Sequence, residues 1–160
     1  MPTSLGAAKN RISAAPKGHS DDMDSMDVDG EIRRLLTETH TWAVVGLSGN
    51  TFRPAYGVAR FLQGVGKRIV PVHPRAETVH GETGYKSLAD IPFEVDVVDV
   101  FVNSRRAGEI ADEALASTKA RAVWFQLGVI DESAAERVRA AGRTMVMNRC
   151  PAIEWPRLGL

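Results

Sequence analysis

The chain has 160 residues, of which 44% are hydrophobic and 25% charged, with 20 basic side chains against 20 acidic ones. A length of this order suits one domain with its own core. The balanced charge gives no long-range attraction to nucleic acid or to an anionic membrane, and no apolar run approaches the roughly 20 residues of a membrane span. The single cysteine, Cys150, excludes an intramolecular disulfide and fits a reducing compartment. We therefore expect a cytoplasmic protein that binds neither nucleic acid nor membrane.

The first 28 residues differ from the rest of the chain, because they lack apolar periodicity and contain a cluster of aspartates at 21–27. This composition predicts a disordered tail over residues 1–28, followed by one folded domain over residues 29–160. Lys9, Arg11 and Lys17 have no acidic neighbour before position 21. An organellar transit peptide is therefore the alternative to a cytoplasmic location.

Beyond the tail, short apolar runs alternate with segments whose apolar residues recur at helical spacing. The predicted strands cover residues 42–47, 68–72, 95–102, 122–127 and 144–147. The predicted helices cover residues 31–40, 56–65, 107–117 and 132–141, with a short helical turn at 87–92. This alternation predicts an α/β fold: one doubly wound Rossmann-like domain with a five-stranded, mainly parallel sheet and helices on both faces. In such a sheet the ligand binds at the carboxyl ends of the strands.

The turn after the first predicted strand combines glycines with polar donors and the start of a helix. Gly46 and Gly49 let the backbone approach a phosphate closely, and the helix start supplies free N–H groups. Ser48 adds a hydroxyl and Arg53 a bidentate cation, while Pro54 suits the first turn of a helix. A plain glycine-containing turn without ligand is the alternative. The convergence of donors favours a phosphate-bearing ligand.

The glycine spacing bears on which nucleotide the turn would hold. Gly46 and Gly49 are followed by the next glycine only at Gly57, so the pattern G-x-G-x-x-G is not met. An NAD enzyme also needs an acidic residue at the end of the second strand, where this chain has His73, with Glu77 several residues beyond. Both departures argue against an NAD(P)-binding enzyme or redox sensor, which remains the alternative function.

Several ordered segments within residues 42–155 resemble the small stand-alone CoA-binding domain proteins, which are related to the nucleotide-binding domain of the succinyl-CoA synthetase α subunit. The matching segments are AVVGLS at 43–48, RPAYGV at 53–58, VPVHP at 70–74, DVVDVF at 96–101, WFQLG at 124–128 and NRCP at 148–151. The resemblance implies the same Rossmann-like fold and binding of coenzyme A or an acyl-CoA. The synthetase's phosphohistidine chemistry belongs to a second domain that this chain lacks, so we expect binding without catalysis. A third alternative is an interaction protein with a vestigial turn, and the sequence identifies no protein partner.

The resemblance also implies a set of contact residues. The ADP portion of CoA would lie over the first turn and helix start, with the adenine-ribose region beside His73 and Pro74. The implied contacts are Gly46, Leu47, Ser48, Gly49, Arg53, Pro54, Tyr56, Gly57, His73, Pro74, Phe101, Val102, Gln126 and Gly128. Many such proteins are basic directly after the third strand, whereas here the basic pair comes later, at Arg105 and Arg106. This pair either contacts the 3′-phosphate or forms a solvated helix start.

Five further residues call for an interpretation. Cys150 either forms a mixed disulfide with the CoA thiol or is a small buried hydrophobe, the more frequent role of a lone cysteine. Asp99 lies inside a buried strand, so we expect it to be hydrogen-bonded. Asp131 is typical of a helix N-cap. The pair Trp124 and Phe125 indicates core. The histidines show no metal-ligand spacing, and no catalytic set can be assigned.

Overall fold

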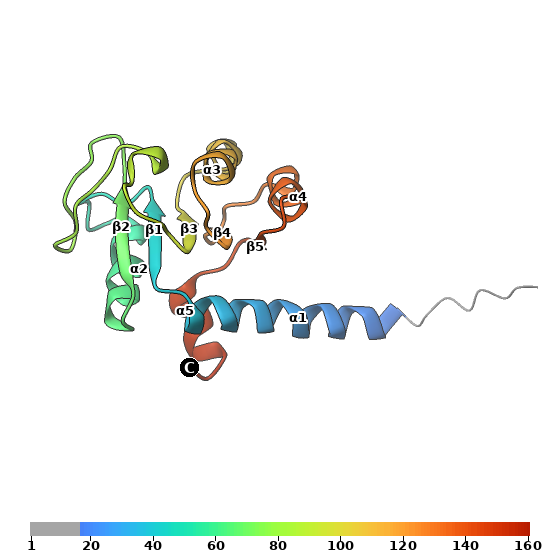
Figure 1. Ribbon diagram of the computed structural model, residues 1–160. Coiled ribbons are helices and arrows are strands. Elements are labelled where there is room, and N and C mark those ends of the chain that lie inside the picture. Colours follow the sequence, from blue (N-terminus) through green and yellow to red (C-terminus); the bar gives the residue numbers. More distant parts are fainter. Residues whose placement is uncertain (1–16) are drawn as a thin grey trace, which may run out of the picture.

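The computed structural model describes residues 17–160, which form a parallel β-sheet between two layers of helices (Figure 1). Its strands are β1 (Thr41–Val45), β2 (Arg68–Val72), β3 (Val97–Val100), β4 (Ala122–Phe125) and β5 (Thr144–Val146). They are hydrogen-bonded in the order β2-β1-β3-β4-β5, and every neighbouring pair is parallel. The doubly wound Rossmann-like α/β fold predicted from the sequence is confirmed, with a sheet that is parallel throughout.

Helices cover both faces of this sheet. They are α1 (Lys17–Glu38), α2 (Pro54–Gly64), the 3₁₀ turn η1 (Leu88–Asp90), α3 (Ser104–Ser117), α4 (Glu132–Ala140) and α5 (Pro151–Arg157). In Figure 1, α1, α2 and α5 lie on one side of the sheet, and α3 and α4 on the other. The strand order reverses between β1 and β3, because the chain places β2 outside β1 before returning to β3. In doubly wound folds this reversal opens a crevice at the carboxyl ends of the strands.

Helix α1 begins earlier than the predicted helix at 31–40, within the segment that composition assigns to a disordered tail. Its buried residues are Ile32, Leu35 and Leu36, whereas Asp27 and Val28 are exposed. The apolar periodicity that predicts a helix from residue 31 therefore marks the packed part of α1, and the helix extends beyond it (Figure 1). The tail prediction for residues 1–16 lies outside the described residues, and the domain boundary near residue 29 stays a prediction.

Helix α5 is an element that the sequence reasoning missed. It is seven residues long, starts with Pro151 and contains Pro156. Too short for a clear apolar period, it packs against α1 and α2. One ion pair attaches it to α1, because the Nη2 of Arg157 lies 2.6 Å from Asp29 Oδ1. Within α5, the Nε of Arg157 pairs with the buried carboxylate of Glu154.

The sheet is buried on both faces. Trp124 and Phe125 are fully buried on opposite faces, which confirms their assignment to the core. On β3, Val98 and Val100 face α3 and α4, so alternation turns Asp99 towards α1, α2 and α5. The expectation that Asp99 is hydrogen-bonded is wrong, because its carboxyl oxygens have no hydrogen-bond partner among the described residues. Burial between apolar strands raises the pKa of Asp99 well above its ordinary value of 3.8.

Within residues 17–160, no helix combines the length and the apolar character that crossing a bilayer requires.

Candidate ligand-binding site

Gly46 directs the chain out of β1 and across the edge of the sheet. Its φ is +100°, and an added Cβ would lie 3.2 Å from the Cβ of Phe101 at the end of β3. Its N–H donates to the carbonyl of Val72, the last residue of β2, at 2.8 Å. The turn therefore lies directly against the ends of β2 and β3, an approach that a side chain at position 46 would strain.

Beyond Gly46 the turn is held by its own side chains. Leu47 is fully buried in the core and anchors the turn to it. The hydroxyl of Ser48 accepts from Asn50 N at 3.3 Å, and Asn50 Oδ1 accepts from Phe52 N at 3.0 Å. Pro54 then stands at the first turn of α2, where its missing N–H costs no helical hydrogen bond. The free N–H groups of that helix start lie beside the turn and favour an anion there.

Glu77 reaches this turn from the segment that follows β2. Its Oε2 accepts from Gly49 N at 2.7 Å, and its Oε1 lies 3.9 Å from the Nε of Arg75. The segment is held close to Gly84, since a Cβ on that glycine would lie 2.1 Å from the carbonyl oxygen of Glu77. The carboxylate of Glu77 therefore accepts from the N–H of Gly49, a donor that could otherwise bind a phosphate oxygen.

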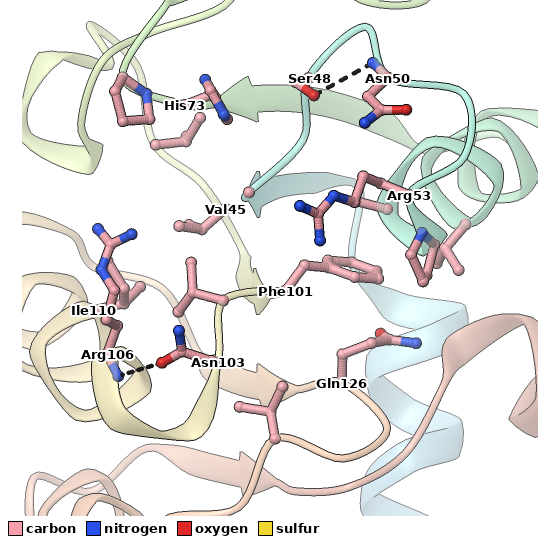
Figure 2. A pocket seen from close by; sticks show the side chains of 18 of the residues that line it. Val45, Ser48, Asn50, Arg53, His73, Phe101, Asn103, Arg106, Ile110 and Gln126 are labelled. Carbon is pink, nitrogen blue, oxygen red and sulfur yellow. Dashed lines mark hydrogen bonds between the residues drawn. The ribbon is translucent and has the colours of Figure 1, made fainter.

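A cavity of about 710 Å³ lies at the carboxyl ends of β1, β2, β3 and β4 (Figure 2). The turn after β1 and the start of α2 form one wall, and the start of α3 forms another. Four cationic side chains line it, each exposed and each from a different segment. They are Arg53 before α2, Arg75 after β2, Lys86 before η1 and Arg106 in α3. This local positive charge contrasts with the zero net charge of the whole chain.

Glu113 is the acidic residue of the lining, and its carboxylate is engaged elsewhere. Its Oε1 accepts from the backbone N–H of Leu88 at 2.8 Å and of Ala89 at 3.3 Å, at the start of η1. At the start of α3, Asn103 Oδ1 accepts from the backbone N of Arg106 at 3.2 Å (Figure 2). This cap orients the first turn of α3, which carries Arg106 to the cavity.

Gln126 and Cys150 line a buried part of the cavity, with exposed fractions of 5% and 6%. The backbone of Arg149 pairs with β4, because its N donates to the Phe125 carbonyl at 3.3 Å and its carbonyl accepts from Trp124 Nε1 at 2.8 Å. Cys150 therefore follows a residue that is bonded to the end of β4. The favoured expectation for Cys150, a buried small side chain, agrees with this burial, and the cysteine still borders the cavity.

The structure brings most of the sequence-predicted site residues together. Those that line the cavity are Gly46, Ser48, Arg53, Pro54, His73, Pro74, Phe101, Val102, Gln126 and Cys150. Five others lie outside the lining. Leu47 is in the core, the N–H of Gly49 is bonded to Glu77, and Gly57 is exposed on α2. The ring of Tyr56 packs on His80 at 4.3 Å between centroids, and Gly128 N donates to Asn148 Oδ1 at 2.8 Å.

The sequence reasoning missed several lining residues. Among those not foreseen are Asn50, Arg75, Lys86, Ser87, Asn103, Ile110 and Glu113. Lys86 reaches the site because its neighbour Tyr85 pairs in parallel with Val72 at the end of β2, a contact without a sequence signal. The sequence did carry a signal for Arg75, since it directly follows His73 and Pro74, which were predicted to flank the ligand. Of the flagged basic pair, Arg106 lines the cavity and Arg105 does not.

Among the described residues, no group of three or more His, Cys, Asp or Glu side chains could hold a metal ion. The site consists instead of a glycine turn, a helix start and four cationic side chains around a partly apolar cavity. This arrangement is typical of the class of doubly wound α/β proteins that bind a phosphate-bearing small molecule at the strand-order reversal.

The chain belongs to the CoA binding domain family, whose family model matches residues 40–156. It is 34% identical to YneT of Bacillus subtilis (strain 168) over 120 residues, which are 75% of this chain and 88% of that protein. A solved hypothetical protein from Pyrococcus horikoshii OT3 is 36% identical with a TM-score of 0.77, covering 81% of this chain and 91% of its own. A solved protein from Thermus thermophilus is 34% identical with a TM-score of 0.75, covering 81% and 98%.

Proposed function

We propose that this protein binds coenzyme A or an acyl-CoA in the cavity and holds it without catalysing a reaction. The observation that carries the proposal is the pairing of the Gly46 turn with four cations from four different segments. CoA has phosphate at two places, the pyrophosphate and the 3′-phosphate, so it needs anion-binding groups at more than one point. Membership of the CoA binding domain family supports the same ligand.

The geometry suggests a role for each part of the lining. The pyrophosphate would lie over Gly46 and Ser48, where the start of α2 and Arg53 supply N–H donors and charge. His73 and Pro74 would flank the adenine-ribose region. Arg106, which lines the cavity, would contact the 3′-phosphate. The pantetheine arm would then extend towards the buried end of the cavity, where Cys150 lies.

Calorimetry with the full chain tests the proposal. Binding should be clear with CoA and absent or much weaker with NAD; the reverse order would refute it. Arg53→Ala should weaken the binding of CoA by about 1.5–3 kcal/mol, the cost of one charge-assisted contact. Arg60→Ala is its matched control, because Arg60 is exposed on the same helix outside the cavity lining.

A second pair of variants tests the 3′-phosphate contact. Arg106→Ala should weaken CoA but leave dephospho-CoA unaffected, because only CoA carries that phosphate. Arg105→Ala, at the neighbouring exposed arginine outside the lining, should change neither affinity. Equal losses for both ligands would remove Arg106 from this role.

One observation favours the NAD(P) alternative. The carboxylate of Glu77, bonded to Gly49 N at 2.7 Å, is an acidic group near the phosphate turn, as recognition of a ribose diol requires. If NAD is the ligand, Glu77→Ala should lower its affinity. If CoA is the ligand, removal of this carboxylate should leave CoA binding unchanged or strengthen it, since a competing anion is lost.

A further inference from the structure

Three buried oxygen atoms on one face of the sheet lack a donor. Both carboxyl oxygens of Asp99 and the Oε1 of Gln126 are enclosed and have no hydrogen-bond partner among the residues that the structure describes. Each such acceptor costs free energy if it stays unpaired, so the arrangement needs a physical account.

Strand register places these atoms on neighbouring strands. Asp99 of β3 is paired with Trp124 of β4, and Gln126 follows two residues later, so its side chain leaves the sheet on the same face as that of Trp124. Gln126 N donates to the carbonyl of Val100 at 3.1 Å, which continues the parallel ladder beyond β4. Gln126 is therefore the diagonal neighbour of Asp99, a relation within reach of long side chains.

A proton on Asp99 would supply the missing donor. Because Asp99 is fully buried, desolvation raises its pKa well above the ordinary value. The neutral carboxyl has one O–H to donate, and Gln126 Oε1 is an acceptor on the same face. With Oε1 engaged on the protein side, the –NH₂ of the same amide is left for the cavity that Gln126 lines.

The carbonyl groups of the proposed ligand fit this position. Gln126 and Cys150 are both buried and both line the cavity, and Phe101 lies between the side chains of Gln126 and Arg53 in the view of Figure 2. A donor on the far side of Phe101 from Arg53 would meet the pantetheine arm or the acyl group rather than a phosphate. Both of those parts carry carbonyl oxygens that accept one hydrogen bond.

We propose that Gln126 is a specificity residue whose amide N–H donates to a carbonyl oxygen of the pantetheine arm or acyl group, and that protonated Asp99 is the positioning residue that orients this amide. The inference rests on the proposed CoA function and deepens it. It assigns recognition of the arm to a neutral pair, separate from the cations that hold the phosphates.

Gln126→Leu tests the donor, measured by calorimetry with ADP, CoA and acetyl-CoA. We expect affinity for CoA, acetyl-CoA or both to fall about three- to tenfold, the cost of one neutral hydrogen bond. Affinity for ADP, which lacks the arm, should not change. Equal losses for CoA and acetyl-CoA assign the contact to the arm, and a loss confined to acetyl-CoA assigns it to the thioester carbonyl. Gln63→Leu is the matched control, on α2 outside the lining. Unchanged CoA and acetyl-CoA affinities, or an equal loss for ADP, would overturn the proposal.

Asp99 is tested by a conservative and an apolar variant. Asp99→Leu removes the donor and should reduce arm-dependent affinity by the same factor as Gln126→Leu, whereas Asp99→Asn keeps an N–H donor and should restore most of it. In the double variant Asp99→Leu with Gln126→Leu, the loss should equal that of Gln126→Leu alone. Additive losses, or no rescue by asparagine, would refute the positioning role.

The controls separate this inference from the proposed function. Circular dichroism and denaturant midpoints show whether each variant folds, and the Gln126→Leu result stands by itself if Asp99→Leu does not. A wild-type chain that fails to bind CoA overturns the proposed function and with it the inference. A wild-type chain that binds CoA, beside a Gln126→Leu variant of equal affinity, overturns the inference alone.

Discussion

Replacement of Asp99 by asparagine should change how the stability of this protein depends on pH. The folded state keeps the buried carboxyl protonated because desolvation raises its pKa, whereas the unfolded chain releases the proton above about its ordinary value of 3.8. The contribution of Asp99 to stability is therefore fully present below that value. It declines as the pH rises and is lost once the pH passes the raised folded pKa.

The size of the effect follows from the number of protons. Within this window, one proton bound only by the folded state makes the free energy of unfolding fall by about 1.4 kcal/mol per pH unit. Asp99→Asn has nearly the same shape and cannot ionise, so it lacks this slope. Other titrating groups are common to both proteins and cancel in the difference, so the relative stability of the asparagine variant should rise steadily with pH.

Urea unfolding of both proteins at intervals from pH 4 to pH 8 measures this difference. Asp90→Asn, at an exposed aspartate, controls for the loss of one carboxyl group. A stability difference between the wild type and Asp99→Asn that stays constant across the range would show that the carboxyl is not held protonated. It would also remove the donor on which the orientation of Gln126 depends.

Three further substitutions test the site and its frame. Gly46→Ala forces a side chain into a backbone with φ of +100°, 3.2 Å from the Phe101 Cβ, and should lower the free energy of unfolding by about 1–2 kcal/mol in urea titrations; an unchanged midpoint would contradict the strain. Asp131→Ala removes the cap on Ala134 N, a 3.0 Å bond that confirms Asp131 as the N-cap of α4, and should cost about 1 kcal/mol, largely recovered by Asp131→Ser. Incubation with CoA disulfide should exchange one CoA onto the Cys150 thiol and release one CoA thiol, seen by mass spectrometry in the wild type but not in Cys150→Ser; a wild-type chain without the adduct would exclude the thiol contact.

Several features were predictable because their signals are local. The N-cap of α4 at Asp131 depends on residues within one helical turn. The predicted strands and helices correspond to observed elements, though strand ends differ: the apolar runs at 95–102 and 122–127 exceed β3 (Val97–Val100) and β4 (Ala122–Phe125). At the carboxyl ends the extra residues are Phe101, Val102, Gln126 and Leu127, which line the cavity beyond the paired part of each strand. At the other end of β3, the carboxylate of Asp96 accepts from the backbone of His40 and Thr41. Apolar character at a strand end therefore did not show where pairing stops.

Contact residues were harder to place, because helix rotation and loop packing decide which side chains face the cavity. Arg53 and Tyr56 are three residues apart at the start of α2, yet Arg53 lines the cavity and Tyr56 packs on His80. Glu77 was noted as too distant from the second strand to serve as a ribose partner, but the loop folds back and bonds it to Gly49.

The sequence by itself determined the doubly wound α/β class and the glycine turn at Gly46 before a helix start, since apolar periodicity, glycine content and helix capping act over a few neighbouring residues. Only the tertiary structure decided which charges surround that turn and that Asp99, whose burial the strand pattern predicted, has no hydrogen-bond partner among the described residues. Arg75, Lys86 and Arg106 meet there because β2, β1 and β3 are adjacent at the order reversal. Such contacts join residues far apart in the chain, and their geometry is set by the packing of the whole sheet.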